Sequence, residues 1–83
     1  MSDLLNSIIE TYEEEEFLLA DGFDDAIIGV ETQTMRLIYS YTKCIEILEA
    51  QGMERDEALE FFEYNTIGSY VGEKTPIWCE DFF

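Results

Sequence analysis

The first quarter of the chain has the spacing of an amphipathic helix. Its hydrophobic residues return at steps of three and four, at Leu4, Leu5, Ile8, Ile9 and Tyr12. Such steps place side chains on one helical face. Ser2 or Ser7 can cap the start of this helix by accepting a hydrogen bond from a first-turn N–H, and Gly22 after Asp21 can end it. The pattern predicts a helix over residues 1–21.

Two short segments that follow are typical of strands. Residues 26–30 are rich in β-branched side chains, and residues 35–41 alternate with aromatic and branched ones. Only residues 31–34 separate the two segments, a connection short enough for an antiparallel hairpin. We therefore expect two paired strands.

Helical signals return after the hairpin. Thr42 can cap a second helix that closes at Gly52, and the acidic residues that begin at Glu54 suit the first turn of a third helix, where the dipole favours negative charge. The apolar side of this third helix consists of Ala58, Leu59, Phe61 and Phe62. Asn65 is four residues beyond Phe61, so we expect it to be a buried, hydrogen-bonded amide.

The chain closes with a short strand. Pro76 precedes residues 77–79, and a proline at the start of an edge strand removes no needed N–H. The predicted order is α-β-β-α-α-β, an α+β fold in which two or three helices pack on a small antiparallel sheet of about three strands. At 83 residues the chain is expected to be one domain, with residues 1–21 as an acidic helix and residues 22–83 as the α+β scaffold.

Charge adds the main functional information. Twenty acidic residues face four basic ones and no histidine, for a net charge of −16, while 47% of the residues are hydrophobic. This composition predicts a folded polyanion. Direct binding of nucleic acid or an anionic membrane is disfavoured and a basic partner is favoured. Without a basic leader or an apolar run near the ~20 residues needed to span a bilayer, the chain is expected to be soluble and intracellular.

Catalytic and metal-binding signals are weak. Histidine is absent, and Cys44 and Cys79 are 35 positions apart without a CxxC spacing, so we expect reduced core thiols and no zinc site. The acidic clusters lack the ligand spacing of a calcium-binding loop, and a helical run of glutamates cannot converge on one ion. We expect no enzyme activity, no cofactor and no specific metal site.

Two acidic rows are the candidate binding residues. Carboxylates three or four positions apart on a helix are about 5–6 Å apart, a spacing comparable to that of phosphates along a strand. The first row is Glu13, Glu14, Glu16, Asp21, Asp24 and Asp25, and the second is Asp56, Glu57, Glu60 and Glu63. A solvated surface is the alternative, but solubility of a small domain needs a net charge of only ~2–8. The negative charge beyond this range favours mimicry of nucleic acid.

Aromatic residues offer a different interpretation. They concentrate near the C-terminus, at Tyr64, Tyr70, Trp78, Phe82 and Phe83. They either complete a small core or form a patch for a protein partner or a second copy, because aromatic side chains anchor binding hot spots. In that second case the charge serves solubility only.

A set of short motifs from residue 22 to residue 77 extends the picture. They are Gly22-Phe23-Asp24, Ala26-Ile27-Ile28-Gly29, Tyr39, Lys43-Cys44-Ile45, Gly52-Met53, Glu57-Ala58, Phe62-Glu63-Tyr64-Asn65, Gly68, Tyr70-Val71-Gly72 and Thr75-Pro76. This succession resembles a family of small phage-encoded proteins without an assigned activity, and the segment 57–76 is its most specific part. The resemblance implies a viral protein that acts in a bacterial cytoplasm.

Size and charge, without any motif, are similar to those of anti-CRISPR and anti-restriction proteins. The sequence therefore predicts a monomer or small homo-oligomer that blocks a basic nucleic-acid-binding host protein, with the DNA-loading surface of a CRISPR effector complex as the preferred target. The alternative is an interaction module that uses the C-terminal aromatics.

Overall fold

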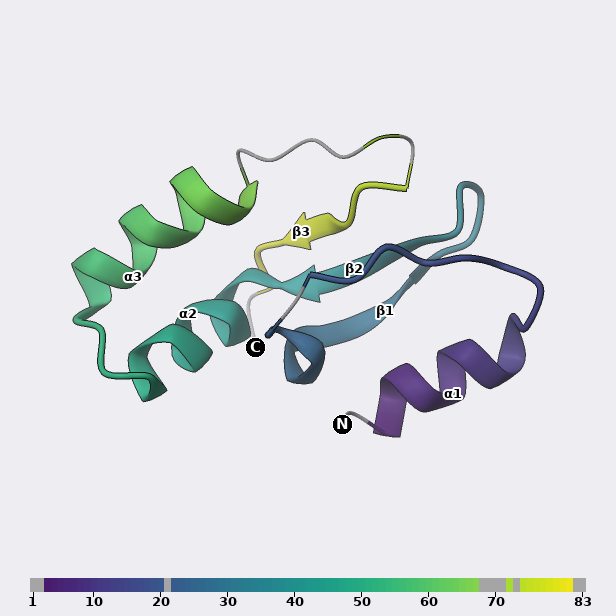
Figure 1. The fold of residues 1–83 in the computed structure, drawn as a ribbon, viewed down its shortest axis with the longest axis horizontal. Helices are drawn as coiled ribbons and strands as arrows, with labels where there is room; N and C mark the ends of the chain where they lie inside the picture. The colour runs from purple at the N-terminus through teal and green to yellow at the C-terminus, as the bar shows by residue number, and fades with distance from the viewer. Residues whose placement is uncertain (1–2, 21, 68–71, 73, 82–83) are drawn as a thin grey trace.

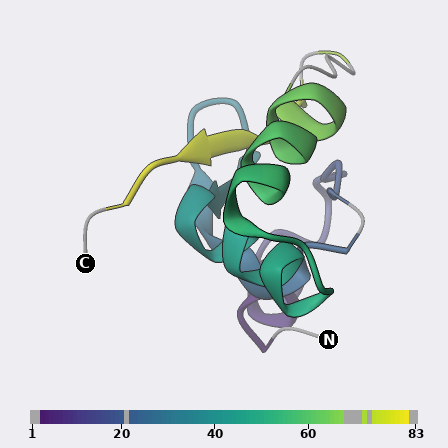
Figure 2. The ribbon, with the colours of Figure 1, turned by 90° about the vertical axis from the view of Figure 1, so that its left-hand side faces the viewer.

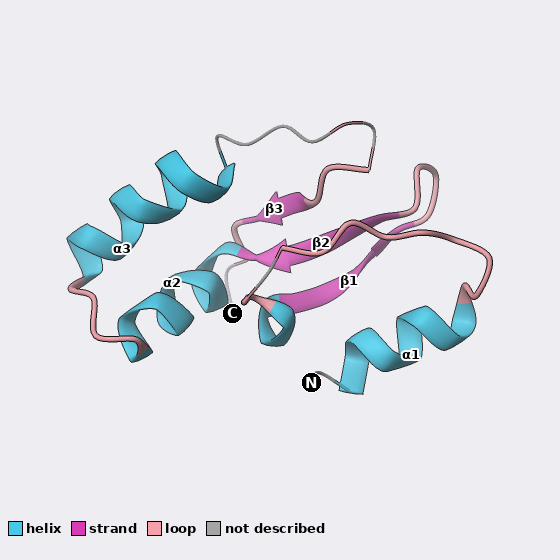
Figure 3. Ribbon diagram, viewed as in Figure 1, coloured by secondary structure: helices cyan, strands magenta, loops and turns pink. Residues whose placement is uncertain are grey.

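A three-stranded sheet forms the centre of the computed structural model, which describes residues 3–20, 22–67, 72 and 74–81 (Figures 1 and 3). The helical and extended elements follow one another as α1 (Asp3–Thr11), η1 (Asp24–Ala26), β1 (Ile27–Glu31), β2 (Arg36–Ser40), α2 (Tyr41–Ala50), α3 (Arg55–Phe62), η2 (Glu63–Ile67) and β3 (Ile77–Cys79). The predicted α+β class and the order α-β-β-α-α-β are confirmed, with η1 and η2 as short additional helical turns.

The sheet has the order β1-β2-β3 and is mixed. β1 and β2 form the expected antiparallel hairpin, with Glu31 opposite Arg36, whereas β3 pairs with β2 in parallel, with Trp78 opposite Tyr39. The expectation of a wholly antiparallel sheet is therefore wrong for this pair. The reason is topological, because α2 and α3 form a crossover that returns the chain to the end of the sheet where β2 began. β3 is an edge strand, as expected.

The first helix is shorter than its sequence pattern indicates. α1 ends at Thr11, so the predicted helix over residues 1–21 is wrong beyond that point. The carboxylates of Glu13 to Glu16 would repel one another and the negative end of the helix dipole, and the last turn of α1 carries no basic residue to offset them. Ser7 lies inside the helix, where its carbonyl accepts a bond from Thr11 Oγ1, and Ser2 lies outside the described residues.

The second and third helices have well-defined ends. Ser40, and not Thr42, caps α2, because Ser40 Oγ accepts a bond from the Lys43 N–H at 3.1 Å. At the other end Gly52 takes a positive φ of 105°, and the N–H groups of Gly52 and Met53 bond to the carbonyls of Glu49 and Leu48. This is the Schellman arrangement that glycine favours, and it ends the helix where the sequence predicted.

The core is organised around Phe62 on α3. Its ring lies 5.5 Å from that of Phe23 and 5.2 Å from those of Tyr41 and Trp78, in edge-on geometry. Trp78 also contacts Tyr39, so the aromatic cluster joins α3 to β2 and β3. Edge-on aromatic pairs contribute beyond their buried area. Trp78 therefore packs against the core, one of the two roles left open for the C-terminal aromatics. Tyr70, Phe82 and Phe83 lie outside the described residues.

The helices lie at different ends of the molecule. In Figure 1, α2 and α3 are neighbours at one end of the longest dimension, 39 Å, and α1 and the turn after it lie toward the other end. Figure 2 views the molecule from the end that holds α2 and α3. The segment from residue 15 to residue 20 is extended and returns toward the sheet. Tyr39 Oη accepts a bond from the Ala20 N–H at 2.8 Å, which attaches this segment to β2.

Candidate functional site: two acidic surfaces

The second acidic row occupies the outer surface of α3 and the turn η2. α3 turns Ala58 and Phe62 into the core, where both are fully buried. Positions on the opposite side are exposed, and the row consists of Asp56, Glu57, Glu60 and Glu63. Asp56 lies four positions before Glu60, while Glu57 and Glu63 each lie three positions from Glu60. The Cβ atoms of such pairs on a helix are about 5–6 Å apart, the spacing that the sequence predicted. We call this set the α3 row.

One member of the α3 row is oriented by a hydrogen bond. Tyr41 Oη donates to Glu63 Oε1 at 2.9 Å, from the first residue of α2. Partial burial raises the pKa of Tyr41, and the bond to the Glu63 carboxylate raises it further, so the phenol remains a donor at neutral pH. Glu63 is therefore held at one end of the row by an uncharged hydrogen-bond donor.

Two open hollows include the exposed Tyr64 in their lining. Glu57, Glu60 and Tyr64 contribute to both hollows, while Leu59 lies in one and Phe61 in the other. Tyr64 is 81% exposed and Phe61 is 40% exposed, so the acidic surface also presents aromatic rings. The prediction that Phe61 belongs to the buried side of this helix is wrong, since Ala58 and Phe62 already fill that side.

Sequence reasoning grouped Tyr64 with the C-terminal aromatics and missed its position beside the α3 row. The available signal was its spacing, four positions after Glu60 and seven after Glu57, which is one helical face. Asn65 is also exposed, and the prediction that it is buried is wrong. Its Nδ2 donates to the Phe61 carbonyl at 3.2 Å, a bond of the helix end and not of the core.

The first acidic row does not form one surface in the structure. Glu13 and Glu14 lie in the turn after α1, Glu16 lies in the extended segment, and Asp24 and Asp25 belong to η1. Asp24 is partly buried and the other four are exposed. In Figure 1 the loop after α1 is at one end of the molecule and η1 is near its centre. Asp21, which the sequence also placed in this row, lies outside the described residues.

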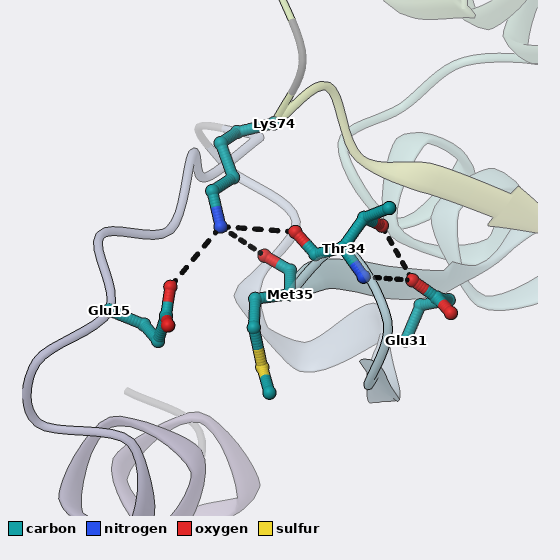
Figure 4. Close-up of polar contacts among 5 residues, drawn as sticks. All are labelled: Glu15, Glu31, Thr34, Met35 and Lys74. Carbon is teal, nitrogen blue, oxygen red and sulfur yellow. Dashed lines mark hydrogen bonds and ion pairs between the residues drawn. The ribbon is translucent and has the colours of Figure 1, made fainter.

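A lysine holds the loop after α1 against the hairpin. Lys74 Nζ lies 3.3 Å from Glu15 Oε2 and donates to the carbonyls of Thr34 and Met35 at 3.0 and 3.3 Å (Figure 4). The contact joins three segments that are distant in sequence, and sequence reasoning did not anticipate it. It neutralises Glu15, which belongs to neither row.

The turn of the hairpin is ordered by a neighbouring carboxylate. Glu31 accepts bonds from the N–H group and Oγ1 of Thr34 (Figure 4) and from the N–H group of Gln33. The bond from the Thr34 side chain, followed by the two backbone bonds, lowers the pKa of Glu31. Met35, which completes the turn, has a positive φ of 54°. The Lys74 contact therefore rests on a turn with its own internal bonds.

Neither acidic row is neutralised within the described part of the chain. The ion pairs found there are Lys74 with Glu15 and Arg55 with Glu49, the latter at 3.7 Å between Nη1 and Oε1. None of the nine described members of the rows takes part in either pair. As far as the structure describes them, the carboxylates of both rows therefore take part in no ion pair.

The cysteines lie apart from the acidic rows. Cys44 is fully buried, and burial, with a smaller effect of the Asp81 carboxylate, raises its pKa to about 12. A thiol with this pKa is protonated at neutral pH and is a poor nucleophile. Cys79 is partly buried on β3, and neither cysteine is in a disulfide. Cys44 is thus the core thiol that the sequence predicted.

Metal ligands do not converge among the residues that the structure describes, where no group of three or more carboxylates or thiols could hold an ion. The helices of the described ranges are also too short or too polar to cross a bilayer. Comparison with protein-family models, curated proteins and solved structures found no match to this chain. The acidic surfaces are therefore the features of this chain that indicate a function.

Proposed function

We propose that this chain is a phage-encoded inhibitor that occupies a basic nucleic-acid-binding surface of a host defence complex. It acts in the bacterial cytoplasm as an acidic mimic of nucleic acid, and the DNA-loading surface of a CRISPR effector complex is the preferred target. The carboxylates take the places of phosphates and pair with lysine and arginine of the partner. Occupation of that surface excludes DNA by mass action.

The observation that carries this proposal is the α3 row of exposed and unpaired carboxylates. Four of them follow one another at helical spacing on a single surface, and neither ion pair of the described residues involves them. A surface that served only to solvate the protein would need no such concentration. Electrostatic attraction between this negative surface and a positively charged partner would also raise the rate of association.

The two rows differ in what they support. The α3 row has the spacing that mimicry requires, whereas members of the first row come from a turn, an extended segment and η1. We therefore assign the main contact to the α3 row, with Asp56, Glu57 and Glu60 as phosphate surrogates and Glu63 as the member held by Tyr41. The first row, which is divided between the loop after α1 and η1, has a secondary role in long-range attraction.

The proposal is tested by capture and competition with DNA. Immobilised protein is exposed to bacterial lysate that contains the candidate defence complex, and bound complex is eluted with rising NaCl or with duplex DNA. Mimicry predicts that both remove it, because ionic contacts weaken with salt and DNA competes for the same surface. If the complex stays bound at high NaCl and in the presence of excess DNA, the proposal is contradicted.

Two variants of equal charge locate the contact. The first neutralises the α3 row by Asp56→Asn, Glu57→Gln, Glu60→Gln and Glu63→Gln. The matched control removes four charges elsewhere by Glu13→Gln, Glu14→Gln, Glu16→Gln and Asp25→Asn. We expect the α3 variant to lose capture and the control to retain most of it. If the protein is instead an interaction module that uses its C-terminal aromatics, both variants will bind as the wild type does.

A further inference from the structure

The α3 row shares its side of the helix with Tyr64, and we call the row together with Tyr64 the α3 surface. Phosphate mimicry does not use the exposed ring of Tyr64. Tyr64 is 81% exposed, and it lines two hollows that also share Glu57 and Glu60. Leu59 and Phe61 add apolar surface, one to each hollow. The surface therefore combines an accessible π-face with carboxylates that line the same hollows.

This combination matches the chemistry of arginine. A guanidinium is planar, stacks on aromatic faces and keeps N–H groups directed outward in its plane, where carboxylates can accept them. An ammonium is a compact, strongly hydrated charge that pairs with carboxylates but does not stack as a plane. Phosphate surrogates alone would discriminate less between the two cations, so Tyr64 adds a preference.

We propose that the α3 surface binds an arginine of the partner, with the guanidinium stacked on Tyr64 and paired with Glu57 or Glu60. The occupant is an arginine-bearing segment of a basic protein, and charge complementarity with the surrounding carboxylates selects it. This inference deepens the proposed function and rests on it, because it names the side chain that the same surface prefers. Tyr64 is its specificity-determining residue.

The test uses the full chain and two peptides of equal charge, hexa-arginine and hexa-lysine. Binding is measured by titration calorimetry at low salt, and contacts are located by amide chemical shifts in ¹⁵N spectra. We expect hexa-arginine to bind about two- to five-fold more tightly, the ratio that an exposed cation–π contact implies. The largest shifts are expected at Tyr64, Glu60 and Glu57.

Two substitutions at Tyr64 isolate the ring. Tyr64→Phe keeps the π-face and should keep the preference for arginine, whereas Tyr64→Leu keeps an apolar side chain and should bind both peptides equally. Because Tyr64 is so exposed, neither variant should alter the fold, which the unchanged spectrum of the remaining residues would verify. Leu19→Ala, at an exposed apolar residue of the extended segment, is the control and should keep the preference.

The outcomes separate this inference from the proposed function. Equal affinity of the wild type for both peptides, a preference that survives in Tyr64→Leu, or shifts confined to residues 13–16 would overturn the role of Tyr64. The proposed function is judged separately, by DNA competition and by the neutralised α3 row. If the variant with the neutralised α3 row binds neither peptide while the wild type binds both equally, this result would support the acidic contact and reject the preference for arginine.

Discussion

The two acidic regions of this protein contain similar residues but differ in how the fold supports them. The α3 row is built on a helix that Phe62 anchors in an aromatic cluster. The loop after α1 has the denser run, Glu13 to Glu16, yet it is extended and attached through Tyr39 and Lys74. Density of charge in the sequence therefore does not indicate which carboxylates share an ordered surface.

This difference has a physical cause. A helix fixes the spacing of its side chains through backbone bonds, and burial of one face fixes its orientation. Four adjacent glutamates beyond a helix C-terminus oppose further helix because they repel one another and the dipole. The same residue type thus extends an ordered array in one region and ends the helix in the other.

The strongest test of the comparison removes the anchor of α3. We expect Phe62→Ala to lower the free energy of unfolding by about 3–5 kcal/mol, because it leaves a cavity among three aromatic neighbours. Urea denaturation measures the change. The matched control is Phe61→Ala, at the preceding position, where the side chain is 40% exposed. This variant should lower the free energy of unfolding far less. Similar losses in the two variants would mean that Phe62 does not anchor the α3 row.

A smaller effect is expected where the extended segment meets the sheet. Tyr39→Phe removes the hydroxyl that accepts the Ala20 N–H, while the buried ring stays in place. The loss should be about 1 kcal/mol, the usual net contribution of one hydrogen bond. Amide exchange at Ala20 should accelerate, whereas exchange within α3 should follow only the global change in stability. Unchanged exchange at Ala20 would show that this bond does not hold the segment.

The contact of Lys74 should contribute still less to stability. Lys74→Met removes the ion pair with Glu15 and two bonds to hairpin carbonyls, at a site that is about one third exposed. Exposed ion pairs contribute up to about 1 kcal/mol, and salt screens them. We expect a loss of that order at low salt and a smaller one in concentrated NaCl. Lys43→Met, at an exposed lysine outside both ion pairs of the described residues, is the control and should be near neutral.

The smallest effect concerns pH and the hairpin beneath Lys74. The pKa of Glu31 is lowered from its ordinary value of 4.5, so the ionised form stabilises the folded state above that pH. This contribution should disappear as the pH falls from 4.5 through the lowered pKa. The difference in unfolding free energy between the wild type and Glu31→Gln should therefore be constant at neutral pH and shrink in acid. A difference that grows in acid would contradict this sign.

Several local features could be predicted from particular residues. The hairpin follows from two branched segments and a short connection, and the end of α2 follows from Gly52. The spacing of the α3 row follows from positions 56, 57, 60 and 63 once that segment is helical. These features depend on neighbours within a few positions, which sequence patterns contain.

Other features depended on contacts between distant segments. Ser40 displaces Thr42 as the cap of α2, where its hydroxyl also donates to Asp81 at 2.6 Å. Lys74 meets Glu15 across 59 positions, and no local pattern pairs them. No sequence pattern distinguishes the environments of Tyr64 and Trp78, but Tyr64 is on the surface and Trp78 contacts Phe62 in the core.

The sequence by itself determined the charge of −16, the class and order of the elements and the helical spacing of the α3 carboxylates, because composition and short-range periodicity are local properties. Only the tertiary structure decided that β3 runs parallel to β2, that α1 stops at Thr11 and that Tyr64 stands among the α3 carboxylates. Those outcomes depend on which distant segments pack together. The packing of Phe62 against Trp78 in one cluster, for example, fixes how α3 and β3 lie relative to each other.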